Sequence, residues 1–211
     1  MKARMVGAAL LCTWLFLASG VASAGTYGFD NLPVATAPPS GYAGITTWDD
    51  SFEVVARDCC GDSGYLFNNV SPNNEIFDYN ERAELGGRGD PTFTLTSFYV
   101  GAAWNDCEDL QVVGLLNGVQ VGNDNILLVI SSTGPAQFVS LNWSGINEVD
   151  FSPYGGVNHG WNGIGEMFII DDLCINGNCS VGTTTPEPPT IAMFVSAVCV
   201  CFGVLRRKTL A

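Results

Sequence analysis

The chain has 211 residues with a formal net charge of −13, and all 21 acidic residues lie between Asp30 and Glu187. Only three of the eight basic residues fall in that stretch, so it carries a formal charge of −18. Contacts with phosphates need a basic face, so this charge excludes nucleic-acid binding. Because so many carboxylates repel one another in a compact fold, we expect them to be solvated or to bind a cation such as calcium.

The first 24 residues have the composition of a secretory signal peptide. Lys2 and Arg4 precede an apolar run over residues 5–18, and the small residues Ala22-Ser23-Ala24 follow it. This order predicts export and cleavage before Gly25. Residues 25–180 are then numerous enough to form one domain with its own hydrophobic core.

Short runs of β-branched and aromatic residues, separated by turn-forming residues, fill this body. The pattern predicts an all-β fold, a single β-sandwich or jelly-roll domain over residues 25–180. A hairpin is expected where Asn117-Gly118 separates two apolar runs, because this dipeptide favours a two-residue turn. We expect strands over residues 27–32, 45–48, 52–56, 65–69, 75–79, 92–100, 110–116, 119–121, 125–131, 136–142, 148–151 and 167–175.

Five of the eight cysteines lie in the exported body, in a context that permits disulfides. Cys174 and Cys179 flank an Asn-Gly turn signal, which predicts a disulfide across a short loop. Cys107 is expected to pair with Cys59 or Cys60, which leaves one thiol over. The adjacent Cys59 and Cys60 also leave open a disulfide with each other or a metal site, although no second Cys/His pair has zinc spacing.

A glycine-rich loop over residues 155–165 is the candidate ligand site. It holds Trp161 and the sole histidine, His159, between Asn158 and Asn162. Loops on a rigid sandwich commonly carry binding, and an indole flanked by amides suits a sugar. The alternative is that Trp161 folds back as a hydrophobic plug. The other tryptophans of the body are expected in the core: Trp48, Trp104 and Trp143.

Catalysis finds little support in the sequence. There is no H-E-x-x-H motif and no recognisable nucleophile motif, although a Ser-His-Asp arrangement through His159 stays open. Carboxylate pairs for glycoside hydrolysis can be drawn from Asp49, Asp50, Glu53, Glu81, Glu84, Asp106, Glu108, Asp109 and Glu166. Because any acidic protein offers such pairs, the sequence favours a non-catalytic protein.

Segments along most of the body carry a family resemblance. They include Phe29-Asp30-Asn31-Leu32 near the start, Leu141-Asn142-Trp143-Ser144-Gly145-Ile146 later, and Phe168-Ile169-Ile170-Asp171-Asp172-Leu173 at the end. The last of these is similar to the closing strand of galactose-binding-like jelly rolls. That resemblance implies that the first and last strands lie near each other.

A calcium site is expected if those strands are neighbours. Asp30 and Asn31 would then lie close to Asp171 and Asp172, which supplies the hard oxygen ligands that calcium prefers. The alternative is that one of Asp171 and Asp172 faces solvent while the other caps a turn.

The end of the chain combines Pro186-Glu187-Pro188, an apolar run over residues 191–205 and Arg206-Arg207-Lys208. This order resembles the PEP-CTERM sorting signal of Gram-negative bacteria. The resemblance implies a membrane anchor over residues 190–211 after a linker at 181–189, and cleavage near the triplet by an exosortase. Fifteen helical residues rise only ~22 Å, less than the ~30 Å hydrocarbon core, which suits a temporary anchor. The alternative is an ordinary anchor that is never cut.

These features predict an exported protein that is sorted to the cell surface or extracellular matrix. We expect a non-catalytic role, with extracellular polysaccharide as the candidate partner. Two alternatives stay open: a secreted glycan-active hydrolase that uses paired carboxylates, and a purely structural matrix protein.

Overall fold

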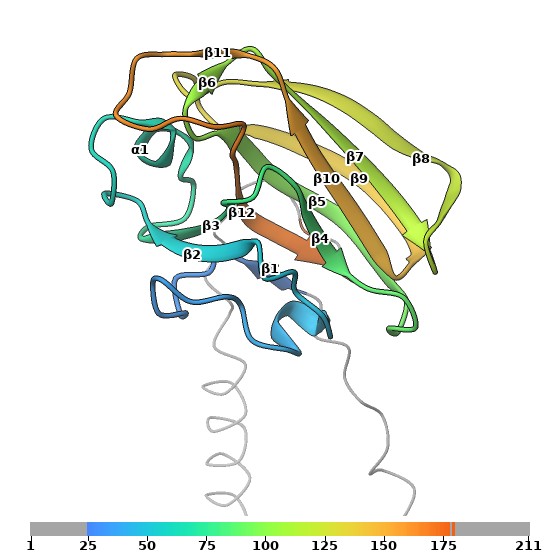
Figure 1. Ribbon diagram of the computed structural model, residues 1–211. Coiled ribbons are helices and arrows are strands. Elements are labelled where there is room, and N and C mark those ends of the chain that lie inside the picture. The colour runs from blue at the N-terminus through green and yellow to red at the C-terminus, as the bar shows by residue number, and fades with distance from the viewer. Residues whose placement is uncertain (1–24, 178, 180–211) are drawn as a thin grey trace, which may run out of the picture. The chain divides into compact units, whose positions relative to one another are not determined.

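Residues 25–177 and 179, which a computed structural model describes, form twelve strands and two short helices (Figure 1). The helices are the 3-10 helix η1 (Tyr42–Gly44) and α1 (Gly64–Asn68). The strands are β1 (Gly25–Tyr27), β2 (Phe52–Ala56), β3 (Asn74–Asp78), β4 (Ala83–Gly86), β5 (Phe93–Ala102), β6 (Asn105–Asp106), β7 (Glu108–Leu116), β8 (Val119–Ile130), β9 (Gln137–Ile146), β10 (Glu148–Tyr154), β11 (Val157–Asn158) and β12 (Phe168–Ile175).

Two antiparallel sheets pack face to face. One has the order β2-β3-β12-β5-β9, with β1 also paired to β12, and the other has the order β4-β10-β7-β8. A two-stranded ribbon of β6 and β11 lies with α1 at the upper end in Figure 1, whereas β1 and η1 lie at the lower end. The expected all-β sandwich is therefore present.

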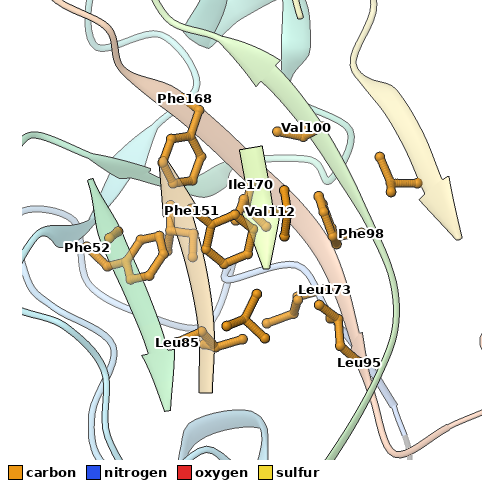
Figure 2. Close-up of a cluster of buried hydrophobic side chains, with 14 of the residues drawn as sticks. Phe52, Leu85, Leu95, Phe98, Val100, Val112, Phe151, Phe168, Ile170 and Leu173 are labelled. Atoms are coloured by element: carbon orange, nitrogen blue, oxygen red, sulfur yellow. The ribbon is translucent and has the colours of Figure 1, made fainter. Parts of the chain in front are cut away.

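Phenylalanines from both sheets meet in the core (Figure 2). Phe151 of β10 stacks on Phe168 of β12, with ring centroids 5.3 Å apart, and meets the edges of Phe52 and Phe98. All four side chains are almost completely buried. Burying one such ring contributes about 1.5–3 kcal/mol, so this cluster is a main source of sandwich stability.

The predicted hairpin is confirmed. Leu116 pairs with Val119, and Asn117 and Gly118 have φ angles of 53° and 79°. Two positive φ angles in succession define the type I′ turn, which asparagine and glycine adopt most easily. The turn joins β7 to β8.

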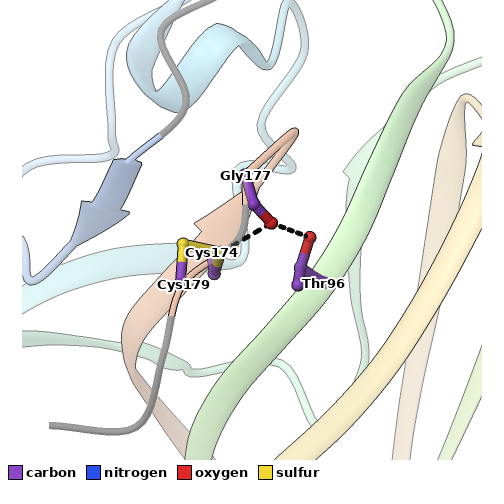
Figure 3. The surroundings of a disulfide bond; sticks show 4 residues. All are labelled: Thr96, Cys174, Gly177 and Cys179. Carbon is purple, nitrogen blue, oxygen red and sulfur yellow. Dashed lines mark hydrogen bonds between the residues drawn. A yellow bond between two sulfur atoms is a disulfide. The ribbon is translucent and has the colours of Figure 1, made fainter.

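The closing strand β12 lies between β3 and β5 and contains Cys174, whereas Cys179 follows it (Figure 3). Cys174 and Cys179 form a disulfide, the pairing expected from the sequence, with Cα atoms 6.0 Å apart. The Thr96 hydroxyl of β5 donates a hydrogen bond of 2.9 Å to the Gly177 carbonyl inside the closed loop. This bond ties the end of the described chain to the sheet.

The expected disulfide between Cys107 and either Cys59 or Cys60 is wrong. Cys59 and Cys60 are bonded to each other, and Cys107 is an exposed free thiol. Cys107 takes a positive φ of 53° at the step from β6 to β7. The vicinal disulfide, left open as an alternative, is the arrangement found.

Three expected strands are also wrong. Residues 65–69 begin in the helix α1, and residues 45–48 contribute only the isolated bridge between Trp48 and Leu85. The third is the strand expected over residues 27–32. Strand β1 ends at Tyr27, because Phe29 has a positive φ of 60° and its carbonyl accepts the amide of Leu32 in a turn. The short strands β4, β6 and β11 were not expected.

The tryptophan expectations hold for two of three positions. Trp48 and Trp143 are each 8% exposed and belong to the main core, whereas Trp104 is half-buried beside a smaller cluster. Within residues 25–177, no helix is long and apolar enough to cross a bilayer. The predicted signal peptide, the linker and the sorting residues Pro186, Glu187, Pro188, Arg206 and Arg207 lie outside the described residues.

Candidate ligand-binding site

The glycine-rich loop is fastened to the end of the sandwich. Its residues Val157 and Asn158 form β11, in which Val157 pairs with Asp106 of β6. The His159 amide donates to the Trp104 carbonyl at 3.0 Å. Gly163 lies so close to the Trp104 indole that an added Cβ would be 2.2 Å from it, so only glycine fits there. The loop therefore presents its side chains from a fixed backbone.

Three rings form a surface cluster that we call the aromatic patch: Phe67, His159 and Trp161. The Trp161 ring lies 4.6 Å from His159 and 6.0 Å from Phe67 between centroids, tilted by 34° and 33°. Phe67 is 43% exposed, the His159 side chain is 39% exposed, and Trp161 is half-buried. Trp161 is thus packed on one side and accessible on another. It is neither a freely projecting ring nor a fully buried plug.

Asp106 organises the polar surroundings of the patch. Its Oδ1 accepts hydrogen bonds from the hydroxyls of Ser131, Ser132 and Thr133, and its Oδ2 lies 2.5 Å from His159 Nδ1. Burial opposes ionisation, but these four hydrogen bonds outweigh it and lower the pKa of Asp106 to about 2.

Because the carboxylate is ionised at neutral pH, Nδ1–H of His159 is the donor in this pair. The Ser132 hydroxyl also accepts the Trp161 indole N–H at 3.1 Å, which fixes the orientation of the ring.

The two asparagines of the loop differ in role. Asn158 donates from Nδ2 to the Gly163 carbonyl and accepts the Gly160 amide, so it braces the loop internally. Asn162 is exposed and makes no hydrogen bond with the described residues. Of the four predicted ligand contacts, Asn158 is therefore a positioning residue, while His159, Trp161 and Asn162 are accessible.

No serine nucleophile completes a triad among the described residues. His159 and Asp106 form the expected kind of pair, but the neighbouring Ser131 and Ser132 donate to the carboxylate of Asp106. A triad needs the serine on the other ring nitrogen of the histidine. The arrangement therefore orients the imidazole without activating a nucleophile.

Two buried carboxyl groups face the core near the same end of the sandwich. Glu108 precedes the buried Leu110 on β7 and Asp78 follows the buried Ile76 on β3, and residues two apart on a strand share a face. Burial, followed by repulsion from Asp78, raises the pKa of Glu108 to about 9. Burial also raises the pKa of Asp78 to about 7. Both residues are 0% exposed, so this pair cannot reach a glycosidic bond in the structure.

The predicted calcium ligands do lie near one another, because β1 pairs with β12. Asp171, however, is 1% exposed, and its oxygens accept the amides of Val70, Ser71 and Asp172. Asp30 accepts the amides of Asn73 and Asn74 at 2.8 Å. These bonds satisfy much of the carboxylate capacity that a cation would use.

The other two predicted calcium ligands are Asn31 and Asp172. Asn31 accepts a hydrogen bond from the Tyr42 hydroxyl, and Asp172 is half-buried. Burial, followed by the charge of Asp30, raises the pKa of Asp172. Among the residues that the structure describes, no group of three or more His, Cys, Asp or Glu side chains is placed to hold a metal ion. Calcium binding at this edge stays a prediction.

Comparison with known proteins finds similarity to solved structures only. No protein-family model matches the chain, and no curated protein matches it. The solved structure of TmCBM61, a carbohydrate-binding module in complex with beta-1,4-galactotriose, is similar over 70% of this chain and 92% of that chain. The identity is 12% and the TM-score is 0.33. Such a likeness carries no argument, so the sandwich and its site rest on the geometry given above.

Proposed function

We propose that this protein is a non-catalytic polysaccharide-binding module, with a jelly-roll topology, whose aromatic patch contacts the sugar. The observation that carries the proposal is the row of partly exposed rings of Phe67, Trp161 and His159. The apolar face of a sugar ring packs on such aromatic surfaces. The patch stands beside polar groups that suit sugar hydroxyls.

Those polar groups have complementary roles. His159 donates Nδ1–H to Asp106 and keeps its other ring nitrogen, Nε2, for a ligand, and Asn162 offers an amide that both donates and accepts. The surrounding protein is strongly acidic, so electrostatic repulsion disfavours an anionic ligand. A neutral polysaccharide therefore fits the patch better than a uronic-acid polymer.

The two alternatives are less well supported. A hydrolase needs an accessible pair of carboxyl groups, whereas the pair Asp78 and Glu108, whose pKa values burial raises to about 7 and about 9, is 0% exposed. A purely structural matrix protein does not account for a histidine oriented by a carboxylate beside a half-exposed indole. Retention of the protein on a polysaccharide separates binding from a scaffold role.

Affinity electrophoresis of the purified protein through gels that contain neutral polysaccharide tests the proposal. Trp161→Ala should raise the dissociation constant by about tenfold or more, equivalent to 1.4 kcal/mol. Tyr79→Ala is the matched control, because Tyr79 is 41% exposed and lies outside the patch. Its migration should equal that of the parent protein.

Folding must be measured alongside binding. Trp143 is 8% exposed and lies in the core, so Trp143→Ala should cost about 3–5 kcal/mol of unfolding free energy. Trp161→Ala should cost less, since that ring is partly exposed. The proposal fails if Trp161→Ala leaves retention unchanged in protein that is still folded.

We further propose that the protein is exported and sorted to the cell surface through the residues that resemble a PEP-CTERM signal, with an exosortase as processing partner. Support comes from the order of Pro186-Glu187-Pro188, the apolar run and the basic end. Intact-mass measurement of surface-released protein should give a chain that starts at Gly25 and ends near the triplet. Full-length protein that stays in the inner membrane of an exosortase-containing cell contradicts this sorting.

A further inference from the structure

A pocket of about 810 Å³ is lined by residues of β1 and η1. Figure 1 shows these elements at the end of the sandwich opposite α1, β6 and β11, which carry or border the aromatic patch. Its wall includes Tyr27, Asp30, Asn31, Tyr42, Thr92 and Asn176. Ligand pockets typically enclose about 300–1,000 Å³, so this one is large enough for a small molecule or a short oligosaccharide. None of these residues belongs to the aromatic patch.

The aromatic wall of the pocket is held in place by the core. The Tyr42 ring lies 5.6 Å from Phe29 and 6.2 Å from Trp48 between centroids, and both of those residues are buried. Tyr27 meets Tyr42 edge to face at 5.5 Å. Because its supports are core residues, Tyr42 presents a rigid surface before any ligand arrives.

Polar groups around the two rings retain bonding capacity. Asn31 accepts the Tyr42 hydroxyl through Oδ1, and Asn176 accepts the Thr94 amide through Oδ1. Each carboxamide therefore keeps its N–H donors for a ligand. Asp30 uses Oδ1 for the amides of Asn73 and Asn74, and keeps Oδ2 as an acceptor.

The combination selects a chemical class of ligand. Two aromatic rings favour a partner with an apolar face, while two amide donors and a carboxylate acceptor favour one with several hydroxyl groups. Asp30 and the acidic body disfavour anions. A neutral saccharide meets all three conditions.

We infer that this pocket is a second binding site for a neutral saccharide, independent of the aromatic patch. The inference shares with the proposed function only the class of ligand. Two sites at opposite ends of one sandwich allow one molecule to hold two polysaccharide chains. Such bivalent attachment raises retention in a matrix well above that of either site alone.

The test is isothermal titration of the full-length protein in detergent with four trisaccharide probes: cellotriose, maltotriose, galactotriose and trigalacturonate. Thr92→Trp should block the pocket, since Thr92 is exposed on its wall and makes no side-chain hydrogen bond with described residues. Asn31→Ala is the second variant and removes one amide donor. Ser140→Trp on β9 is the control, because Ser140 is exposed and does not line the pocket.

We expect at least one neutral probe to bind at two sites per chain and trigalacturonate to bind more weakly. Thr92→Trp should weaken the pocket site by about tenfold or more and leave one site, while Ser140→Trp should keep both. In Trp161→Ala the pocket should still bind. Binding that Trp161→Ala abolishes and both pocket variants leave intact overturns the inference and leaves the patch standing. Binding that both pocket variants abolish and Trp161→Ala leaves intact supports the pocket site and overturns the patch. If no probe binds, both are overturned.

Discussion

Glu108→Gln should stabilise the protein in a strongly pH-dependent way. Glu108 is 0% exposed, and burial with the nearby Asp78 raises its pKa from 4.5 to about 9. Below pH 4.5 the glutamate is protonated in both states and has no effect. Between pH 4.5 and about 9 the unfolded chain releases a proton that the folded chain keeps, so the unfolding free energy falls as pH rises.

The size of the effect follows from that difference in pKa. At 1.36 kcal/mol per pH unit, the interval from 4.5 to pH 7 corresponds to a loss of about 3 kcal/mol. Glutamine is similar in shape and cannot ionise, so the substitution removes this loss. The variant should match the parent protein at pH 4 and exceed its unfolding free energy by about 3 kcal/mol at pH 7.

Urea denaturation from pH 4 to pH 9 measures this difference directly. Glu53→Gln is a chemically matched control, because Glu53 is a half-buried glutamate of β2 outside the core-facing pair. This control reports what the loss of one carboxyl group does at a position away from the buried pair. A stability gain from Glu108→Gln that is the same at pH 4 and pH 7, or a loss at pH 7, would refute the reasoning.

Two further predictions concern the closing strand. Cys174→Ser with Cys179→Ser should lower the unfolding free energy by about 2 kcal/mol, the chain-entropy value for a loop of about six residues, in denaturant titrations. Non-reducing peptide mapping should recover the two cysteines as one linked peptide. If calcium bridges Asp30 and Asp172, chelation should lower the melting temperature and Asp172→Asn should remove the difference. An unchanged melting curve rejects that site.

Much of the sandwich was predictable because its signals are local. The turn between β7 and β8 needs two positive φ angles, which Asn117 and Gly118 adopt readily, so four residues suffice to specify it. In β7 the apolar Leu110 and Val112 alternate with the exposed Gln111 and face the core. Such alternation depends only on strand geometry.

The helix α1 was not predictable in the same way. A five-residue apolar segment can pack as a strand or as a helix, and periodicity cannot separate the two. The deciding contacts are distant in sequence: Asn68 donates through its side chain to the carbonyls of Ala102 and Ser131. Gly64 also lies against the Ala102 carbonyl, where a Cβ has no room. Such contacts exist only once β5 and β8 are in place.

The binding site likewise has a part that the local sequence predicts and a part that depends on tertiary contacts. The glycine-rich loop can be recognised in the sequence by His159 and Trp161, but the residues that these two contact lie in other segments of the chain. Phe67 reaches the patch only because α1 lies beside the loop, and Asp106 is 53 residues from the histidine that it orients. The sequence pattern therefore identifies the loop, while the supporting residues need the tertiary fold.

The acidic pair at the closing strand shows that a buried carboxylate has a structural role that the sequence alone does not indicate. Asp171 lies beside three backbone N–H groups, and these donors supply the compensation that a buried carboxylate needs. Burial nevertheless raises its pKa to about 6, so the N–H groups offset only part of the desolvation. Asp171 thus anchors residues 70 and 71 to β12. The sequence Asp171-Asp172 is compatible with this anchoring role as well as with calcium binding, and the backbone N–H groups that Asp171 accepts become visible only in the fold.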